Sequence, residues 1–148
     1  MSLMGVDIGH GGVKAAVFDY SGNLLTKAYQ EYQTLFPSVG FAEIDSRKVI
    51  ESAFGVIRKA ALAVRKKDPV AAIGIASCGE SFTAVSQKGE IISNAMTTAD
   101  FRAQSLVDPW TKRLNRDFLY QTTGHTPYHM YSIFKLLWFK EQRPAVWE

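Results

Sequence analysis

The sequence has a single cysteine, Cys78, among its 148 residues. One thiol excludes an internal disulfide, and scarce cysteine is typical of proteins that fold in a reducing compartment. The sequence also lacks any apolar run near the ~20 residues that a membrane-spanning helix needs, and its N-terminus lacks the basic and apolar regions of a signal peptide. We therefore expect a cytoplasmic protein with no membrane partner.

A large surplus of one charge is missing as well. Lys and Arg number 17 and Asp and Glu 14, which gives a net charge of +3 at pH 7. The densest basic cluster, residues 65–67, closes a predicted helix, where cations complement the helix dipole. Because the charge is mild and dispersed, we expect no nucleic-acid partner.

The first stretch with a clear pattern is a glycine-rich connection between two β-type runs, residues 3–8 and 13–18. The connection, Gly9-His10-Gly11-Gly12, predicts a tight hairpin, since glycine reaches backbone angles that other residues avoid. N–H groups bared by these glycines suit a phosphate, and Asp7 before the turn is placed for a metal ion carried by that phosphate. A plain glycine hairpin that begins with an Asp stays open as the alternative.

The next segments predict a meander followed by a helix. Residues 24–33 form a third strand after the Ser21-Gly22-Asn23 turn, which makes three consecutive antiparallel strands. Asp45 or Ser46 is placed to cap a long helix. The apolar stripe of this helix is predicted at Ile50, Ala53, Phe54, Ile57, Ala60, Ala61 and Val64.

A further strand follows Pro69, which ends the helix. Residues 70–76 are apolar on both faces, and this predicts a buried interior strand. Because a helix connects it to the meander, the strand is expected to run parallel to the first strand. Two more strands are predicted at residues 82–85 and 91–96, on either side of a turn.

Helical patterns fill the C-terminal part. The first covers residues 100–121, with a break or a fresh first turn at Pro109. The second, residues 133–142, is capped by Ser132 and stopped by Pro144. A three-strand antiparallel meander, a crossover helix, a parallel strand and flanking helices make an α/β fold of the ribonuclease H-like plan, which underlies actin-like ATPases and sugar kinases.

Five stretches of the chain carry motifs in a fixed order. They are Gly5-Val6-Asp7-Ile8-Gly9-His10-Gly11-Gly12-Val13-Lys14-Ala15, Gly40-Phe41-Ala42-Glu43-Ile44-Asp45, Ile73-Gly74-Ile75-Ala76-Ser77-Cys78-Gly79-Glu80-Ser81, Ser93-Asn94-Ala95-Met96-Thr97-Thr98-Ala99-Asp100-Phe101-Arg102-Ala103, and Thr123-Gly124 with Lys135-Leu136-Leu137-Trp138-Phe139-Lys140 and Pro144-Ala145-Val146-Trp147-Glu148. With these motifs the chain resembles the N-terminal part of an FGGY-family carbohydrate kinase, the group that includes xylulose, glycerol, gluconate and ribulose kinases.

Carried over position by position, the resemblance implies two sites. The residues implied in binding nucleotide phosphate are Asp7, Gly9, His10, Gly11, Gly12 and Lys14. The residues implied in binding the sugar or polyol are Cys78, Gly79, Glu80, Ser81, Thr98, Asp100 and Arg102. Asp7 is also implied to hold Mg²⁺ through water, and the general-base aspartate is expected beyond residue 148.

The resemblance implies part of an ATP-dependent, xylulokinase-like enzyme that phosphorylates a hydroxyl of a sugar or polyol, with Mg²⁺ as cofactor and ATP as co-substrate. It also implies that the 148 residues are a truncated first lobe, because family members have more of that lobe and a whole second lobe. We therefore expect this chain to be inactive by itself. A second copy of the chain is a further candidate partner.

Departures from the family pattern leave an alternative open. The hairpin hydroxyls of the family are replaced here by His10, Gly11 and Gly12. Cys78 stands in place of a glutamine and Thr98 in place of a tryptophan. A catalytically decayed module that binds sugar or serves as a scaffold also fits these changes. A ribonuclease H-like nuclease fits less well, because its chemistry needs several carboxylates around two metal ions.

Single residues have plainer interpretations too. Glu80 follows a predicted strand at a glycine, so it also fits a turn. Asp100 also fits the N-cap of a helix, because it opens a helical stretch. Arg102 also fits a partner for Asp100.

Overall fold

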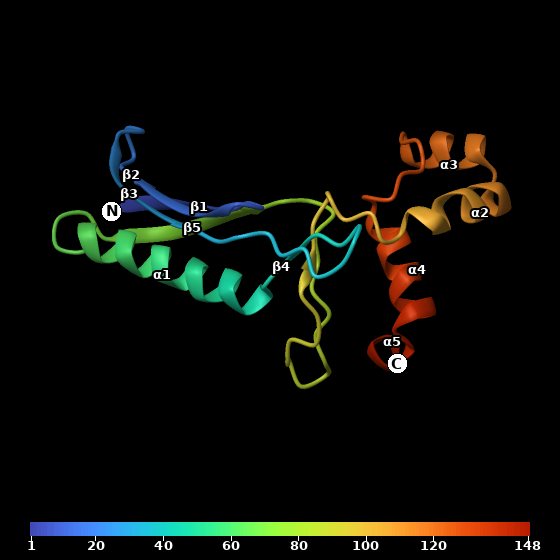
Figure 1. The fold of residues 1–148 in the computed structure, drawn as a ribbon. Coiled ribbons are helices and arrows are strands. Elements are labelled where there is room, and N and C mark those ends of the chain that lie inside the picture. The colour runs from blue at the N-terminus through green and yellow to red at the C-terminus, as the bar shows by residue number, and fades with distance from the viewer. The chain divides into compact units, whose positions relative to one another are not determined.

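The computed structural model describes residues 1–148. It divides into two compact units, of which the first comprises Met1–Thr34 and Ile44–Gly79 and the second Leu35–Glu43 and Glu80–Glu148. Figure 1 shows the elements of each unit in order along the chain. None of the helices is long and apolar enough to cross a membrane.

The first unit is built on a four-stranded sheet of order β3-β2-β1-β5. The predicted antiparallel meander is confirmed: β1 (Ser2–Ile8) pairs with β2 (Gly12–Phe18), which pairs with β3 (Leu24–Glu31). The predicted parallel pairing is confirmed as well, since β5 (Val70–Ser77) runs parallel to β1. The strand β3 ends two residues before its predicted end.

The crossover helix α1 (Ser46–Val64) lies along one face of this sheet (Figure 1). Asp45, one of the two predicted candidates, is its N-cap, and the carboxylate accepts hydrogen bonds from the N–H groups of Arg47 and Lys48. The first four backbone N–H groups of a helix have no partner within the helix, so the cap satisfies two otherwise orphaned donors. The core between helix and sheet is formed by Met4, Val6, Val13, Ala15, Val17, Ala28, Tyr32, Ile44, Val56, Ala60 and Val64.

The predicted stripe of α1 is wrong at two positions. Ile50 is 48% exposed and Phe54 is 70% exposed. Burial follows Ser52, Val56 and Ala60 in steps of four residues, and the two large side chains lie beside that row. The apolar residues span a wide arc around the helix, so the sequence pattern fits more than one rotation of the helix about its own axis.

The prediction that residues 70–76 form a buried interior strand is also wrong. The strand β5 is the edge of the sheet, and Ile73 and Ile75 are 48% and 67% exposed. The reason is that α1 packs on β1, β2 and β3 and does not cover β5. A strand with apolar residues on both faces is expected to be packed against other elements on both faces, but the first unit leaves β5 exposed.

In the second unit, β4 (Glu43–Ile44) pairs with β6 (Ala95–Met96). The strands predicted at residues 82–85 and 91–96 are largely wrong, because outside β6 they pair only through single bridges, Phe82 with Met96 and Val85 with Ile91. The hydroxyl of Ser93 accepts the N–H of Ala84 at 2.9 Å, a place that a strand carbonyl would fill in a regular ladder.

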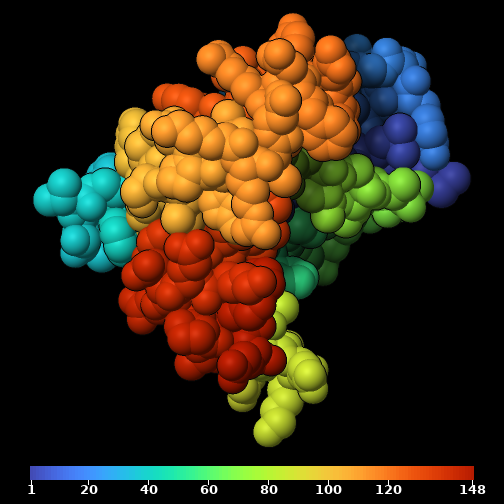
Figure 2. Space-filling view, turned by 90° about the vertical axis from the view of Figure 1, so that its right-hand side faces the viewer, coloured from blue at the N-terminus to red at the C-terminus, as the bar shows by residue number.

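The helices of the second unit are α2 (Gln104–Leu114), α3 (Arg116–Thr123), α4 (Ser132–Gln142) and α5 (Pro144–Trp147). They pack against one another, and the helices coloured orange and red form a continuous surface in Figure 2. Their core comprises Ala103, Val107 and Phe134, with Leu106, Trp110, Tyr131, Leu137 and Trp138 packed against it.

Two predicted helix boundaries need correction. Pro109 lies inside α2 and does not break it; the break falls at Asn115, whose φ is +65° and whose side chain caps α3. Asparagine tolerates this left-handed backbone better than most residues. Ser132 is the first residue of α4 and not its cap, and Tyr131 before it offers no side-chain cap.

Candidate functional site

The predicted phosphate hairpin presents a charged pair on the open face of the first sheet. Asp7 lies opposite Lys14 across the β1–β2 ladder, and both residues are exposed. Opposed residues of antiparallel strands share a face, here the one that α1 leaves uncovered. Small residues leave a shallow hollow beside the pair, lined by Gly5, Ala16, Gly74 and Ala76.

The turn itself is braced by two tyrosines of the first unit that the sequence analysis did not single out. The N–H of Gly9 donates to the carbonyl of Gly12 at 3.0 Å and closes the turn. The Tyr29 hydroxyl donates to the carbonyl of Gly11 at 3.1 Å, and the Tyr32 hydroxyl donates to the carbonyl of Gly9 at 2.5 Å. Nothing in the alternation of residues 24–33 pointed to this role.

Burial raises the pKa of the Tyr32 phenol above its ordinary value, with smaller contributions from Cys78, Tyr29 and Asp7. A raised pKa keeps this hydroxyl protonated, so it remains a hydrogen-bond donor to the turn. The two hydrogen bonds tie the glycine turn to Tyr29 of β3 and to Tyr32.

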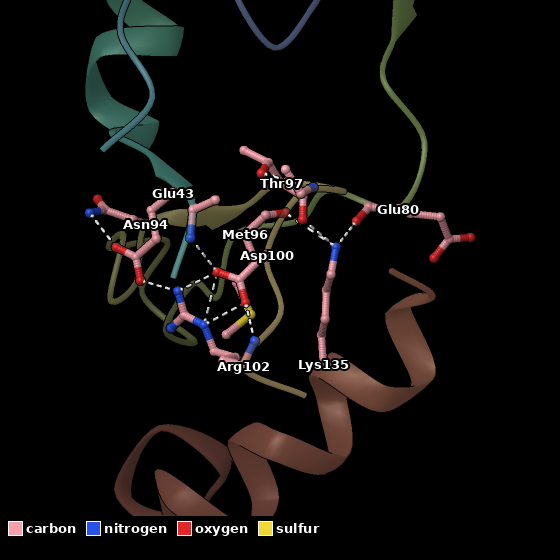
Figure 3. Close-up of polar contacts among 10 residues, drawn as sticks. Glu43, Glu80, Asn94, Met96, Thr97, Asp100, Arg102 and Lys135 are labelled. Carbon is pink, nitrogen blue, oxygen red and sulfur yellow. Dashed lines mark hydrogen bonds and ion pairs between the residues drawn. The ribbon is translucent and has the colours of Figure 1, made fainter. Parts of the chain in front are cut away.

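Glu80 begins the second unit in a strained conformation. Its φ is +57°, in the left-handed region, which costs a residue with a Cβ about 1–2 kcal/mol. Both ends of the residue are held by helix α4. Its carboxylate accepts the N–H of Ser132. Its carbonyl accepts a hydrogen bond from the ammonium of Lys135 (Figure 3). The Glu80 carboxylate thus caps the N-terminus of α4, whose own N-cap residue offers no side-chain cap. Its negative charge also interacts favourably with the positive end of the helix dipole.

Glu80 also borders a pocket of about 400 Å³ in the second unit. The pocket is walled mainly by apolar and aromatic side chains, and Glu80 is its acidic group. Such a combination of apolar walls and a few polar groups is typical of small-molecule sites. The walls include Trp110, Leu114, Leu119, Pro127, Tyr131 and Leu137.

Asp100 and Arg102 form a buried ion cluster with Glu43 (Figure 3). The Arg102 Nη2 lies 2.7 Å from Asp100 Oδ2 and 2.5 Å from Glu43 Oε1, and its Nε lies 2.9 Å from Asp100 Oδ1. Its guanidinium carbon stands 3.8 Å from the ring centroid of Phe41 and 4.9 Å from that of Trp138. The plainer interpretation of Arg102, a partner for Asp100, is therefore confirmed.

The electrostatics of this cluster are those of a structural unit. Burial works to lower the pKa of Arg102, but hydrogen bonds and charge from Asp100 and Glu43 outweigh it and raise that pKa above its usual value. Asp100 is 1% exposed and also accepts the N–H of Ala42 at 2.8 Å. A direct contact of Asp100 or Arg102 with substrate stays a prediction.

The remaining predicted substrate residues are Cys78, Gly79, Ser81 and Thr98. The N–H of Cys78 donates to the carbonyl of Ile8 at 3.1 Å, and its thiol is free and half-buried. Gly79 is exposed, whereas Ser81 and Thr98 are half-buried. No group of three or more His, Cys, Asp or Glu side chains gathers to form a metal centre.

Lys135 is a buried polar residue that the sequence analysis placed in a motif stretch but gave no role. It is 0% exposed, and its Nζ donates to the carbonyl of Glu80, to that of Thr97 at 2.9 Å and to that of Met96 at 3.5 Å. The available signal was a lysine directly beside Phe134 in an apolar helix pattern.

His129, another buried residue, is 1% exposed and lies between the rings of Phe101 and Tyr128. Its Nδ1 is 2.8 Å from Gln104 Oε1, and because an amide oxygen only accepts, Nδ1 carries the proton. Burial lowers the pKa of His129, and the charge of Lys135 lowers it further, against an opposing contribution from Asp100.

The comparisons with known proteins cover the whole chain. The model of the N-terminal domain of the FGGY family of carbohydrate kinases matches residues 2–148. A glycerol kinase of Brachyspira hyodysenteriae is 29% identical over 149 residues, covering 99% of this chain and 30% of that protein. A probable L-xylulose kinase of Pasteurella multocida is 27% identical over 143 residues, covering 95% of this chain and 29% of that protein.

Solved structures agree. A gluconate kinase from Lactobacillus acidophilus superposes with a TM-score of 0.87 at 27% identity, over 99% of this chain and 29% of that one. A xylulose kinase from Rhodospirillum rubrum superposes with a TM-score of 0.94 at 18% identity, over 99% of this chain and 30% of that one, and shows the likeness of fold. The predicted fold class, an actin-like ATPase fold with a mixed sheet, is confirmed. The chain spans about 30% of the length of these relatives, and it belongs to the FGGY family of carbohydrate kinases.

Proposed function

We propose that residues 1–148 are the N-terminal part of the first lobe of an ATP-dependent carbohydrate kinase. The complete enzyme transfers the γ-phosphoryl group of ATP to a hydroxyl of a sugar or polyol, as a xylulokinase does. The observation that carries this proposal is the family match over residues 2–148, together with relatives named glycerol kinase and L-xylulose kinase. We place the enzyme in the cytoplasm, in keeping with its lone cysteine.

The nucleotide phosphates are assigned to the first hairpin. The proposed residues are Asp7, Gly9, His10, Gly11, Gly12 and Lys14. The exposed Asp7 carboxylate fits Mg²⁺ held through water, because Mg²⁺ keeps several waters and takes one or two carboxylates plus substrate phosphates. Two turn carbonyls are already engaged by tyrosine hydroxyls, which leaves the turn richer in donors for an anion.

The residues proposed to bind the sugar or polyol are Glu80, Cys78, Gly79, Ser81, Thr98, Asp100 and Arg102. A carboxylate fixes the orientation of a polyol because it accepts hydrogen bonds from two hydroxyls, and such charge-assisted bonds are the stronger kind. The strain at Glu80 supports this assignment, since strained backbone that a helix holds in place is frequent at functional sites. Asp100 and Arg102 serve as the frame of this region through their ion cluster with Glu43.

In the proposed mechanism, residues of this chain bind and orient the substrates. The proton of the acceptor hydroxyl is taken by a residue outside this chain. The hairpin N–H groups and Lys14 balance the charge of the phosphates, and Mg²⁺ supplies further charge stabilisation to the transferring group when bound. Glu80 binds and orients the acceptor sugar. The general-base aspartate is expected beyond residue 148, so the chain by itself is expected to turn over no ATP.

The test is a coupled assay of ATP consumption by the full-length protein against ketoses, polyols and aldonates. We expect one substrate with a high kcat/KM. Asp7→Asn is expected to lower kcat at least about a hundredfold, and Glu80→Gln to raise the KM for the sugar, each loss reflecting one removed charged contact. Glu51→Gln, on the exposed surface of α1, is the control and leaves both constants unchanged. No turnover with any of the sugars, and no sugar binding, would overturn the proposal.

A second candidate, a decayed kinase-like module, is favoured by the missing hydroxyls at the hairpin. The double variant His10→Thr, Gly11→Thr restores two hydroxyls and leaves Gly12 unchanged, because a Cβ at Gly12 would stand 2.6 Å from the Tyr29 hydroxyl. Sugar binding without turnover in the wild type, and a large gain of turnover in the double variant, identify the decayed module. A wild type that already turns over rapidly excludes it.

A further inference from the structure

Lys135 places a charged group at the centre of the second unit. It has the largest fully buried side chain of the molecule, and its ammonium lies among the main-chain carbonyls of Glu80, Met96 and Thr97 (Figure 3). Burial of an ammonium in a protein interior is costly, and three carbonyl acceptors match its three N–H donors. An apolar side chain at this position would avoid that cost, so the charge points to a task.

The carbonyls that Lys135 binds belong to two separate segments. One is Glu80, which follows the edge strand β5 and has a left-handed φ of +57°. The other is Met96, the last residue of β6, with Thr97 after it, and this segment leads directly into Thr98. One ammonium therefore ties together the two stretches that carry the proposed sugar-binding residues.

Helix α4 grips Glu80 at two points, three residues apart. The N–H of Ser132 fixes the carboxylate, and Lys135 fixes the carbonyl of the same residue. A residue held only at its side chain could relax its backbone out of the left-handed region, and this would swing the carboxylate away. Held at both points, the carboxylate has one direction.

We propose that Lys135 is a positioning residue, which sets the direction of the Glu80 carboxylate for recognition of the sugar hydroxyls. This inference rests on the proposed function, because it takes Glu80 as the sugar-binding carboxylate. Lys135 itself does not touch the substrate. Its effect passes through the main chain of Glu80 and Thr97.

The first test uses the full-length protein and the sugar that the coupled assay identifies. Lys135→Met is expected to raise the Kd and KM for the sugar by about ten- to a hundredfold, since misplacement by about 1 Å costs that much. The KM for ATP stays within about twofold. Lys140→Met, an exposed lysine of the same helix, is the matched control and leaves both constants unchanged. Lys135→Gln, which keeps two N–H donors, replaces Lys135→Met if that variant does not fold.

A double-mutant cycle separates positioning from general support. In a Glu80→Gln background the Lys135 variant is expected to add less than about threefold to the sugar Kd, because the group that it positions is already altered. Equal, additive losses in both backgrounds would overturn the proposal. So would an unchanged sugar Kd in a folded Lys135 variant.

A readout without sugar keeps this inference apart from the proposed function. In the nuclear magnetic resonance spectrum, the amide of Ser132 reports its bond to the Glu80 carboxylate. The Lys135 variant is expected to shift this amide toward its value in Glu80→Gln, whereas Lys140→Met leaves it in place. If the wild type binds no sugar but the amide shifts, the proposed function fails and the positioning holds; if the amide does not move, the positioning fails.

Discussion

Gly12 is the residue of the first turn that has no room for a side chain. A Cβ at this position would stand 2.6 Å from the Tyr29 hydroxyl and 2.6 Å from the carbonyl oxygen of Gln30. The same addition at Gly11 meets nothing within 4 Å. Two glycines of one motif therefore differ in their surroundings. Gly12 allows close packing against Tyr29 and Gln30, whereas the space beside Gly11 is open.

Gly12→Ala is expected to destabilise the chain by about 1–3 kcal/mol, the usual cost of forcing atoms into a packed site. Gly11→Ala is the control and is expected to change stability by less than about 0.5 kcal/mol. Urea unfolding of the two variants, followed by circular dichroism, measures both values. Equal stabilities for the two variants would show that Tyr29 and Gln30 of β3 move aside for a methyl group at position 12 without loss of stability.

The element scale adds what no single residue shows, since Arg102 joins three segments of the second unit. Its guanidinium bonds to Glu43 of β4 and to Asp100 in the turn before α2, and it stacks near Trp138 of α4. The side chains of Arg102 and Asp100 are 4% and 0% exposed. At such burial, one missing partner leaves the others as uncompensated charge.

Arg102→Met is expected to cost about 3–5 kcal/mol of stability, because Asp100 and Glu43 lose their shared cation. The control is Lys48→Met, which removes an exposed pair with Glu51 at 3.9 Å and is expected to cost at most about 1 kcal/mol. Thermal unfolding of both variants measures how much the ion cluster of Arg102 stabilises the fold. A loss at Arg102 no greater than that at Lys48 contradicts the structural role described here.

Local chemistry made several elements predictable. The Asp45 cap, the glycine hairpin and the meander each depend on neighbours in sequence, and all three were predicted correctly. The failures arose where distant groups decide. The Ser93 hydroxyl accepts the N–H of Ala84 where a strand carbonyl was expected, and β5 is exposed at the edge of its sheet. The spacing of residues in the sequence reveals neither of these features. The bracing of the turn by Tyr29 and Tyr32 was missed for the same reason.

At the scale of the molecule, the two units have separate cores, and the titration of His129 belongs to the second. Burial and the charge of Lys135 lower the pKa of this histidine, so the unfolded chain takes up the proton first as the pH falls. Between the lowered pKa and the unfolded value near 6.5, the unfolded state binds more protons. Stability therefore rises with pH in that window and is lost as the pH falls below about 6.5.

We expect the urea midpoint of the second unit to decrease from pH 7 to pH 5.5 in the wild type. His129→Gln is expected to remove this part of the decrease, whereas His125→Gln, an exposed histidine, retains it. Unfolding curves at a series of pH values, with m-values held equal, measure the difference. Parallel pH profiles for the wild type and His129→Gln would show that another group carries the dependence.

The bonds of Lys135 have a consequence for how this domain diverges over evolution. Its ammonium binds the carbonyls of Glu80, Met96 and Thr97, and a main-chain carbonyl is the same whichever side chain its residue carries. Mutations at neighbours such as Ser81 and Thr98 can therefore accumulate in a lineage while the lysine and its helix are inherited. If Ser81 and Thr98 contact the sugar as proposed, exchanging either side chain changes the sugar preference while the contacts of Lys135 stay the same.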